Sequence, residues 1–217
     1  SNFHAYLDGT DNIRVVKWST SGSAADFTLG AQGIDITDLR TPTDVVTADI
    51  TAVDFTGFSF TNGHTYKIQI GSEMSSATIA GAGQGNIDTL LNALTTGVNG
   101  FTDISARREG DTILITSDAN AAFSVTVTDL GADPSVATDD VSLASQVKTG
   151  VQEVKLGAFD STKRYRIIVS STAGNVTAEV DGDDADPRQS LSDDIGAATA
   201  YTSWVAGTSI LIQSATS

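Results

Sequence analysis

The sequence predicts a mainly β protein with short helices, of the α+β class, in which two similar modules follow an N-terminal β-rich segment. The composition leans on Thr, Ser, Ala, Asp and Gly with only 6% aromatic residues, which suits short strands joined by tight turns. Alternating polar and apolar stretches recur along the chain. One of them occurs twice, since residues 66–70 read YKIQI and residues 165–169 read YRIIV.

A second pair of similar stretches follows these two. Residues 111–117 read DTILITS, and residues 208–214 read TSILIQS. Tyr66 precedes Ile113 by 47 residues, and Tyr165 precedes Ile210 by 45. This agreement indicates an internal duplication, and repeated small modules more often build surfaces and assemblies than a single catalytic cleft.

We divide the chain into an N-terminal β-rich segment (1–56), a first module (57–147) and a second, shorter copy (148–217). The N-terminal segment begins with a predicted hairpin, because residues 3–7 and 13–18 flank Asp8-Gly9, a pair that favours tight hairpin turns. Apolar residues spaced mostly by two predict further short strands within 27–39 and 45–53.

The first module is predicted to open with a hairpin in which Asn62-Gly63 joins residues 58–60 to residues 65–70. Asn86 then caps a helix over 87–94, where apolar residues recur at i, i+3, i+4 and i+7. A hairpin of residues 101–108 and 111–117 follows.

The end of this module is less regular. Residues 123–128 predict one more strand. Residues 131–150 then form either a short helix that starts near Asp133 or a linker.

The second copy is predicted to repeat this order of strand, strand, helix, strand and strand. A polar turn at 160–163 joins residues 151–159 to residues 165–169. Asp186 caps a helix with Pro187 at its first position. Residues 201–205 and 209–213 then form a hairpin that turns at Ala206-Gly207. We expect Ile68 and Ile168 to lie in the cores of their modules.

The charge of the chain limits its partners. With 27 acidic and 12 basic residues, the net charge is −15, and such a field repels phosphate backbones and anionic membranes. We therefore expect no nucleic-acid and no membrane partner. The absence of cysteine excludes disulfides, thiolate nucleophiles and Cys-based zinc sites. No apolar run approaches the roughly 18 residues of a membrane-spanning helix.

One cluster of carboxylates offers oxygen ligands to a hard cation such as Ca²⁺. The candidate metal ligands are Asp181, Asp183, Asp184 and Asp186. Their spacing departs from the EF-hand loop, because glycine stands second instead of sixth and Ser192 occupies the twelfth position. A solvated acidic loop that ends in a helix cap also explains these residues, and we favour that interpretation. We expect no cofactor.

Signals for catalysis are sparse. The two histidines are His4 and His64, and His64 follows a turn without an evident orienting partner. The loop at 81–86 (GAGQGN) lacks the last glycine of a dinucleotide fingerprint and the Lys-Ser/Thr ending of a nucleoside-triphosphate loop. We therefore predict that the protein is not an enzyme.

Aromatic residues leave a second class of function open. Tyr6, Trp18, Tyr201 and Trp204 could line a sugar-binding surface. With so few aromatic residues in the chain, core positions or subunit contacts explain most of them equally well.

The modules resemble a known family of proteins. Tyr66 to Ile70, the helix 87–94 and the strand 112–117 look like the small modules of bacteriophage tail proteins, in particular the tail tubular or nozzle proteins of short-tailed phages, and the second copy has the same look. The resemblance covers about half of the chain. It implies a non-enzymatic structural protein of the virion that forms a ring, tube or adaptor.

From this resemblance we expect partners among other copies of the chain and other virion proteins, with subunit contacts at the hairpins 58–70 and 159–169. The protein would be made in the host cytoplasm and be extracellular once assembled in the virion. Two alternatives remain at this stage: a capsid decoration protein, and a carbohydrate-binding adhesin or receptor-binding module.

Overall fold

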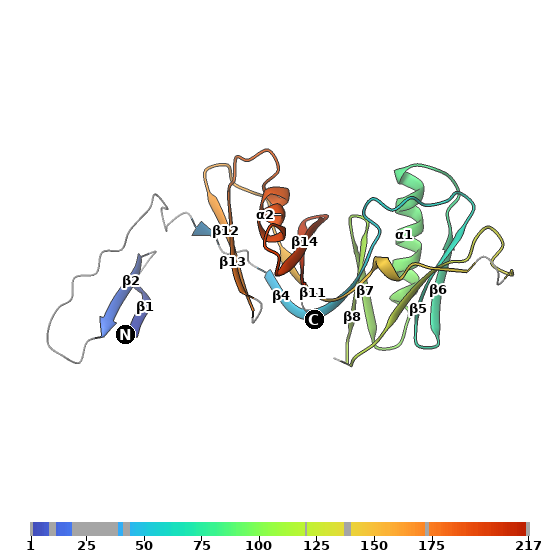
Figure 1. The fold of residues 1–217 in the computed structure, drawn as a ribbon, viewed down its shortest axis with the longest axis horizontal. Helices are drawn as coiled ribbons and strands as arrows, with labels where there is room; N and C mark the ends of the chain where they lie inside the picture. Colours follow the sequence, from blue (N-terminus) through green and yellow to red (C-terminus); the bar gives the residue numbers. More distant parts are fainter. Residues whose placement is uncertain are drawn as a thin grey trace.

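Strands dominate the fold, and two α-helices pack against them in the described part of the chain (Figure 1). The computed structural model describes residues 2–8, 12–18, 39–40, 44–119, 121–136, 140–171 and 174–215. The chain is thus mainly β and of the α+β class, which confirms the class predicted from composition and alternation.

The fold divides into two halves that follow an N-terminal hairpin. The hairpin and a short strand are β1 (Asn2–Asp8), β2 (Asn12–Trp18) and β3 (Leu39–Arg40). The first half comprises β4 (Asp44–Asp54), β5 (Thr65–Ile70), β6 (Glu73–Thr78), α1 (Gln84–Val98), β7 (Ile104–Glu109), β8 (Thr112–Ser117), β9 (Val125–Asp129) and β10 (Val141–Ser142). After a 3₁₀ turn, the second half comprises β11 (Val147–Lys155), β12 (Arg164–Ser171), β13 (Gly174–Asp181), α2 (Pro187–Gly196), β14 (Tyr201–Ala206) and β15 (Ser209–Ser214).

A six-stranded sheet joins the two halves. Its order is β14-β15-β11-β4-β8-β7, so each half contributes three neighbouring strands. The two halves meet where β4 and β11 pair antiparallel, with register shifts on either side of Val151. In each half the first strand also pairs with the second strand of the hairpin that follows the helix, because β4 pairs with β8 and β11 with β15. The long strands β4 and β11 therefore link both halves through backbone hydrogen bonds (Figure 1).

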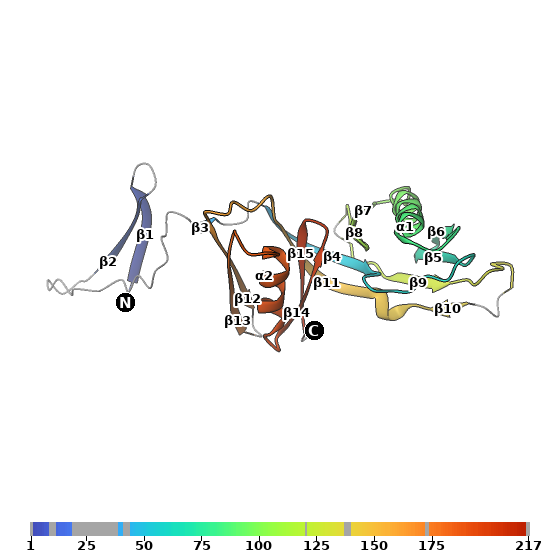
Figure 2. The ribbon, with the colours of Figure 1, turned by 90° about the horizontal axis from the view of Figure 1, so that it is seen from above.

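Each half also carries a smaller sheet built on a hairpin. In the first half the order is β10-β9-β5-β6, and in the second it is β13-β12-β3. Figure 2 shows β9 and β10 running beside β5. The helix of each half packs against one strand of each sheet, since α1 contacts β6 and β7 and α2 contacts β13 and β14.

Equivalent positions in the two halves make the same contacts. The backbone N–H of Thr61 donates to the Tyr66 hydroxyl at 2.9 Å, and that of Asp160 donates to the Tyr165 hydroxyl at 2.8 Å. In both cases the donor lies five residues before the tyrosine. A phenylalanine six residues before each tyrosine packs edge-on against its ring, with centroids 5.1 and 4.7 Å apart.

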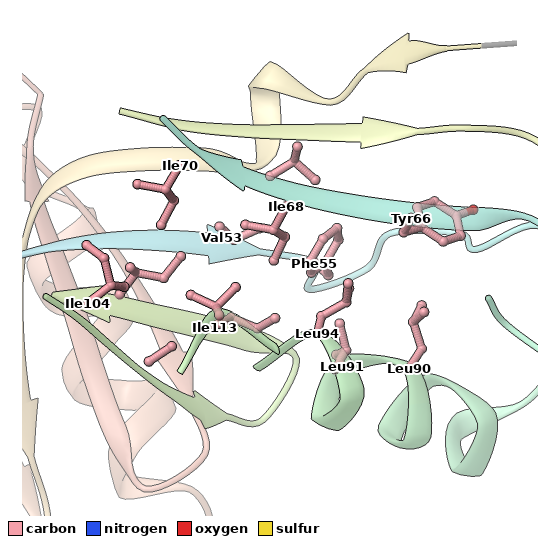
Figure 3. Close-up of a cluster of buried hydrophobic side chains, with 14 of the residues drawn as sticks. Val53, Phe55, Tyr66, Ile68, Ile70, Leu90, Leu91, Leu94, Ile104 and Ile113 are labelled. Carbon is pink, nitrogen blue, oxygen red and sulfur yellow. The ribbon is translucent and has the colours of Figure 1, made fainter. Parts of the chain in front are cut away.

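The core of the first half lies between its two sheets and α1 (Figure 3). Tyr66 and Ile68 point into it from β5, and Leu90, Leu91 and Leu94 point into it from the helix. The helix approaches β6 closely at Gly97. A Cβ atom there would lie 2.0 Å from the Ser75 hydroxyl oxygen, so only glycine permits this packing.

The core of the second half uses fewer side chains. It contains Ile167 from β12, Leu191 and Ile195 from α2, and Ile210 and Ile212 from β15. Tyr165 is half-buried in this core, whereas Tyr66 is fully buried in the first.

Several predicted elements are confirmed. The hairpins β1–β2, β7–β8 and β14–β15 pair as the alternation and turn residues predict, and β9 is the extra strand expected near the end of the first module. Asp186 caps α2 by accepting from the Gln189 N–H at 3.2 Å, with Pro187 at the first helical position. The short strands predicted within 27–38 lie outside the described residues.

The predicted opening hairpins of both modules are wrong. Residues 58–60 lie in a loop, and β5 pairs with β6 through a turn that begins at Gly71. Phe58 and Phe60 still pack against the first core, because the loop folds back onto it. In the second half β11 belongs to the six-stranded sheet, and β12 pairs with β13 instead. Alternation identified the apolar faces but not the partner strands.

Three smaller predictions also fail. Asn86 lies inside α1, whose cap is Gly83, and its side chain donates to the Ala82 carbonyl at 3.2 Å. Residues 133–136 form no α-helix, and β10 and a 3₁₀ turn precede β11. Ile168 is 61% exposed, and its neighbour Ile167 occupies the core position equivalent to Ile68.

The proposed domain boundaries stay predictions. Residue 56 follows β4, which pairs with β8 of the first half and with β11 of the second half. Residue 148 lies within β11. Both limits therefore adjoin or fall in the strands that connect the two halves.

Candidate functional site

The contact between the two halves is the most elaborate arrangement of side chains in the described part of the chain. We call it the seam. An apolar cluster fills it, comprising Ile50, Ala52, Leu114, Val151, Ala206 and Leu211, with Trp204 packed against the cluster. It lies on the face of the six-stranded sheet opposite the two cores.

Strand alternation places these residues at the seam. In β8, Ile113 and Ile115 enter the first core, and Leu114 between them enters the seam. In β15, Leu211 enters the seam in the same way, between two isoleucines of the second core. A strand buried on both faces is apolar at every position. The Ile-Leu-Ile runs in the sequence are therefore the signal that these strands are covered on both sides.

A buried charge lies at the seam. Glu153 of β11 is fully buried, and its carboxylate forms an ion pair with Arg107 of β7. The Ser209 hydroxyl donates to the same carboxylate at 2.6 Å, and Arg107 also contacts Glu109 at 2.6 Å. A buried carboxylate requires such partners, because removing an unpaired charge from water is strongly unfavourable. The ion pair therefore ties the second half to the edge hairpin of the first.

The equivalent positions on the other side of the seam are apolar. Arg107 lies opposite Leu114 in the β7–β8 hairpin, and Trp204 lies opposite Leu211 in β14–β15. Ala52 of β4 lies opposite Leu114, and Glu153 of β11 lies opposite Leu211, so Ala52 and Glu153 are equivalent. One side of the seam thus has an ion pair where the other has tryptophan and alanine.

A second charged pair borders Trp204. Lys148 Nζ lies 2.6 Å from Asp54 Oδ2 and 4.0 Å from the centroid of the Trp204 ring. Burial alone would raise the pKa of Asp54, but hydrogen bonds from Lys148 and Thr56 outweigh it and hold the pKa below its ordinary value. This pair joins the end of β4 to the start of β11.

The two edge hairpins touch through their turns. Gly110 and Gly207 both have positive φ values, 58° and 57°. A Cβ on Gly110 would lie 3.1 Å from the Gly207 nitrogen, and one on Gly207 would lie 3.2 Å from the Gly110 nitrogen. The predicted glycine turns therefore also serve the contact between the two halves.

His64 has an orienting partner that the sequence did not reveal. Its Nδ1 lies 3.0 Å from both carboxylate oxygens of Asp129 on β9. Asp129 also accepts from the Gly131 N–H at 2.8 Å. The hydrogen bonds formed among the described residues engage only Nδ1, and they hold the loop before β5 against β9. The expectation that His64 lacks a partner was wrong, because that partner is 65 residues away in sequence.

The acidic loop uses its carboxylates for local structure. Asp184 accepts from the Asp186 N–H at 2.9 Å and from the Ser190 hydroxyl at 3.1 Å, and Asp181 lies 3.2 Å from Arg164. Asp183 is exposed. Within the described residues, no three His, Asp or Glu side chains are gathered to hold a metal ion. The metal site at these four aspartates stays a prediction.

The aromatic candidates separate into two groups. Tyr201 is buried in the second core, and Trp204 is half-buried at the seam. Lys148 lies over the Trp204 ring, 4.0 Å from its centroid. Tyr6 and Trp18 lie in β1 and β2, where the structure describes the strands alone.

No motif in the sequence predicts the ion pair at the seam. An isolated glutamate among the valines of β11 was the available hint.

Neither α1 nor α2 has the length and apolarity needed to cross a bilayer. Comparison of the sequence with protein-family models and with curated proteins gave no match.

Proposed function

We propose that the chain is a non-enzymatic structural subunit of a bacteriophage virion, a tail component built from two copies of one module. It assembles with other copies of itself and with other virion proteins, and it is extracellular once assembled. The observation that carries the proposal is the pairing of β4 with β11, by which two similar halves join into one continuous sheet.

The duplication is supported by contacts that recur at equivalent positions. Both tyrosine hydroxyls accept from the N–H five residues earlier, and both Ile-Leu-Ile strands divide their side chains between a core and the seam. In addition, the Ile79 N–H donates to the His64 carbonyl, and the Gly182 N–H donates to the Lys163 carbonyl, at 3.0 and 2.7 Å. Two unrelated segments would not be expected to share such details.

A structural role is also supported by how the charged groups are used. Glu153 and Arg107 join the two halves, Asp186 caps a helix, and Asp129 anchors a loop through His64. Each of these charged groups is engaged in holding the fold. The net charge of −15 favours protein partners over nucleic acid.

A capsid decoration protein would share this composition and architecture, so it remains the second candidate for the position in the virion. The burial of Tyr201 and the packing of Trp204 against the seam disfavour a glycan platform in the second half. Of the four aromatic candidates, Tyr6 and Trp18 of the N-terminal hairpin are the other two.

Mass photometry of the purified chain over a range of concentrations, with negative-stain images of the same sample, tests the proposal. Rings, tubes or a defined oligomer are expected. A chain that stays monomeric at all concentrations would overturn self-assembly. Binding of that monomer to capsids, with no binding to tails, would favour the decoration protein.

A further inference from the structure

The two halves differ along one edge of their smaller sheets. In the first half, β9 pairs with β5 over its length, from Tyr66 opposite Asp129 to Ile70 opposite Val125. Along the equivalent edge of β12, the described strands include only β3, which pairs with Arg164 and Tyr165. Residues 166–171 of β12 have no partner strand on that side in the described part of the chain.

The uncovered edge leaves the second core more open. In the first half, Val127 of β9 is 1% exposed and covers the core beside Ile68, which is 0% exposed. The equivalents of Tyr66 and Ile70 are Tyr165 and Val169, and both are half-buried where the first two are buried. The second half is thus more exposed at the positions that β9 covers in the first.

The outer face of this edge carries an apolar residue. Ile168 is 61% exposed at the middle of the uncovered part of β12, where the first half has the polar residue Gln69. Its neighbour on the same face, Arg166, is paired with Glu179 of β13 at 2.5 Å. The edge therefore presents an exposed isoleucine beside a neutralised charge, which suits contact with another protein.

The backbone direction at Ile168 follows from the first half. The Thr65 N–H donates to the Gly131 carbonyl, and the Leu130 N–H donates to the Thr65 carbonyl. Both backbone groups of Thr65 therefore point toward β9. Because the direction of the backbone N–H and carbonyl groups alternates along a strand, these groups of Lys67 and Gln69 also point toward β9. The registers of the two hairpins make Arg166 and Ile168 their equivalents. The N–H and carbonyl of Ile168 therefore point away from β13, toward a side on which no described strand pairs with Ile168.

Both edges of the six-stranded sheet are better protected. The Asn99 side chain, just after α1, bonds both the N–H and the carbonyl of Ala106 in β7, at 2.6 and 2.5 Å. In the second half, α2 packs along β14, and the Ser203 hydroxyl donates to the Ser192 carbonyl at 2.5 Å. Unpaired edges promote association with other strands, so of these three edges β12 is the best placed to associate.

We propose that a second copy of this chain binds at β12 through its own β12, with the two strands antiparallel about Ile168. This inference rests on the proposed role in assembly and names one of its contacts. The chain already contains such a joint, because β4 and β11 connect its two halves by antiparallel pairing. Such a twofold contact uses the same surface on both subunits.

The proposed register avoids repulsion. With Ile168 opposite Ile168 of the partner subunit, the two exposed side chains contact each other. Arg166 then lies opposite Ser170 of the partner subunit, so no like charges face each other across the new pair. The contact spans residues 166–170 of each subunit. In this register Ser171 of the partner subunit lies opposite Tyr165, so forming the contact displaces β3 from the start of β12.

Cysteine cross-linking tests this register, because the chain has no cysteine of its own. Residues opposite each other in an antiparallel pair have Cα atoms about 5.5 Å apart, within the range of a disulfide. The Ile168→Cys variant should form a disulfide-linked dimer under mild oxidation. The matched control is Thr177→Cys, which is exposed and lies directly opposite Ile168 on β13. Because it lies one strand away from the edge, it should cross-link about tenfold less or not at all.

A proline substitution tests the hydrogen bonding. Ile168→Pro removes an N–H that points away from β13, so the hairpin should keep its ladder. This variant should lose the self-association of the parent chain, and Ile168→Ala should keep most of it. Circular dichroism and thermal melting check that each variant is folded.

The outcomes separate this inference from the proposed function. If the parent chain assembles while Ile168→Cys cross-links no better than Thr177→Cys, the β12 contact is wrong and the structural role stands. If the parent chain stays monomeric, the self-assembling role itself fails. Self-association that persists in a folded Ile168→Pro variant would also overturn the β12 contact.

Discussion

The two halves of the molecule share one order of strands and helix, but they differ in what surrounds them. In the first half β9 covers β5, and Tyr66 and Ile68 are fully buried. In the second half most of the equivalent edge has no partner strand among the described residues, and Tyr165 is half-buried. Local sequence thus produces the same hairpin twice, while the neighbouring strand decides how completely it is buried.

The seam shows the same contrast in its chemistry. At one pair of equivalent positions it has Arg107 and Glu153, and at the other it has Trp204 and Ala52. A buried ion pair often contributes little more than apolar residues of similar size, but removing the partner of a fully buried carboxylate such as Glu153 is strongly unfavourable. The two sides of the seam can therefore be stable for different reasons.

Arg107→Ala should have the largest effect, because it leaves the buried Glu153 carboxylate with Ser209 as its remaining partner. We expect the free energy of unfolding to fall by about 3–5 kcal/mol, measured by urea denaturation. The double variant Arg107→Trp with Glu153→Ala imitates the other side of the seam and should recover much of the loss. A double variant less stable than Arg107→Ala would contradict this account.

The two cores should respond unequally to the loss of equivalent isoleucines. Ile68→Ala should lower the free energy of unfolding by about 2–5 kcal/mol. Ile167→Ala should lower it less, because the second core is more open beside β12. The exposed Ile168 provides the control, and Ile168→Ala should change stability by less than about 0.5 kcal/mol. Equal losses at residues 68 and 167 would show that the covering strand β9 has no energetic effect.

The Asp54–Lys148 pair should give a pH-dependent effect. The pKa of Asp54 is lower in the folded chain than its ordinary value near 3.9. Its contribution is therefore complete above that value and is lost as pH falls through the lower folded pKa. Asp54→Asn should reduce stability by about 1 kcal/mol at pH 7, and the difference from the parent should shrink in strong acid. Thermal melting between pH 7 and pH 2 measures it.

The tyrosine hydroxyls should give the smallest difference. Tyr66→Phe leaves the Thr61 N–H without its acceptor in a partly buried site, and we expect a loss of about 1 kcal/mol. Tyr165→Phe should lose less, since the Asp160 N–H is exposed and water can replace the hydroxyl. Chemical denaturation of both variants tests this order.

The sequence by itself determined the local elements. Alternation and turn residues predict the hairpins β7–β8 and β14–β15, and Asp186-Pro187 predicts the start of α2. These features depend on residues close together in the chain, so their physical causes can be read from short segments. The mainly β class follows from the same short-range signals.

Only the tertiary structure decided which strands are neighbours. The pairing of β4 with β11, the ion pair between Arg107 and Glu153 and the contact of His64 with Asp129 join residues that are far apart in sequence. A strand's alternation defines its apolar face but not its partner, which is why both predicted opening hairpins were wrong. Burial and pairing depend on the packing of the whole chain, and among the described residues this packing leaves most of β12 without a partner strand on one side.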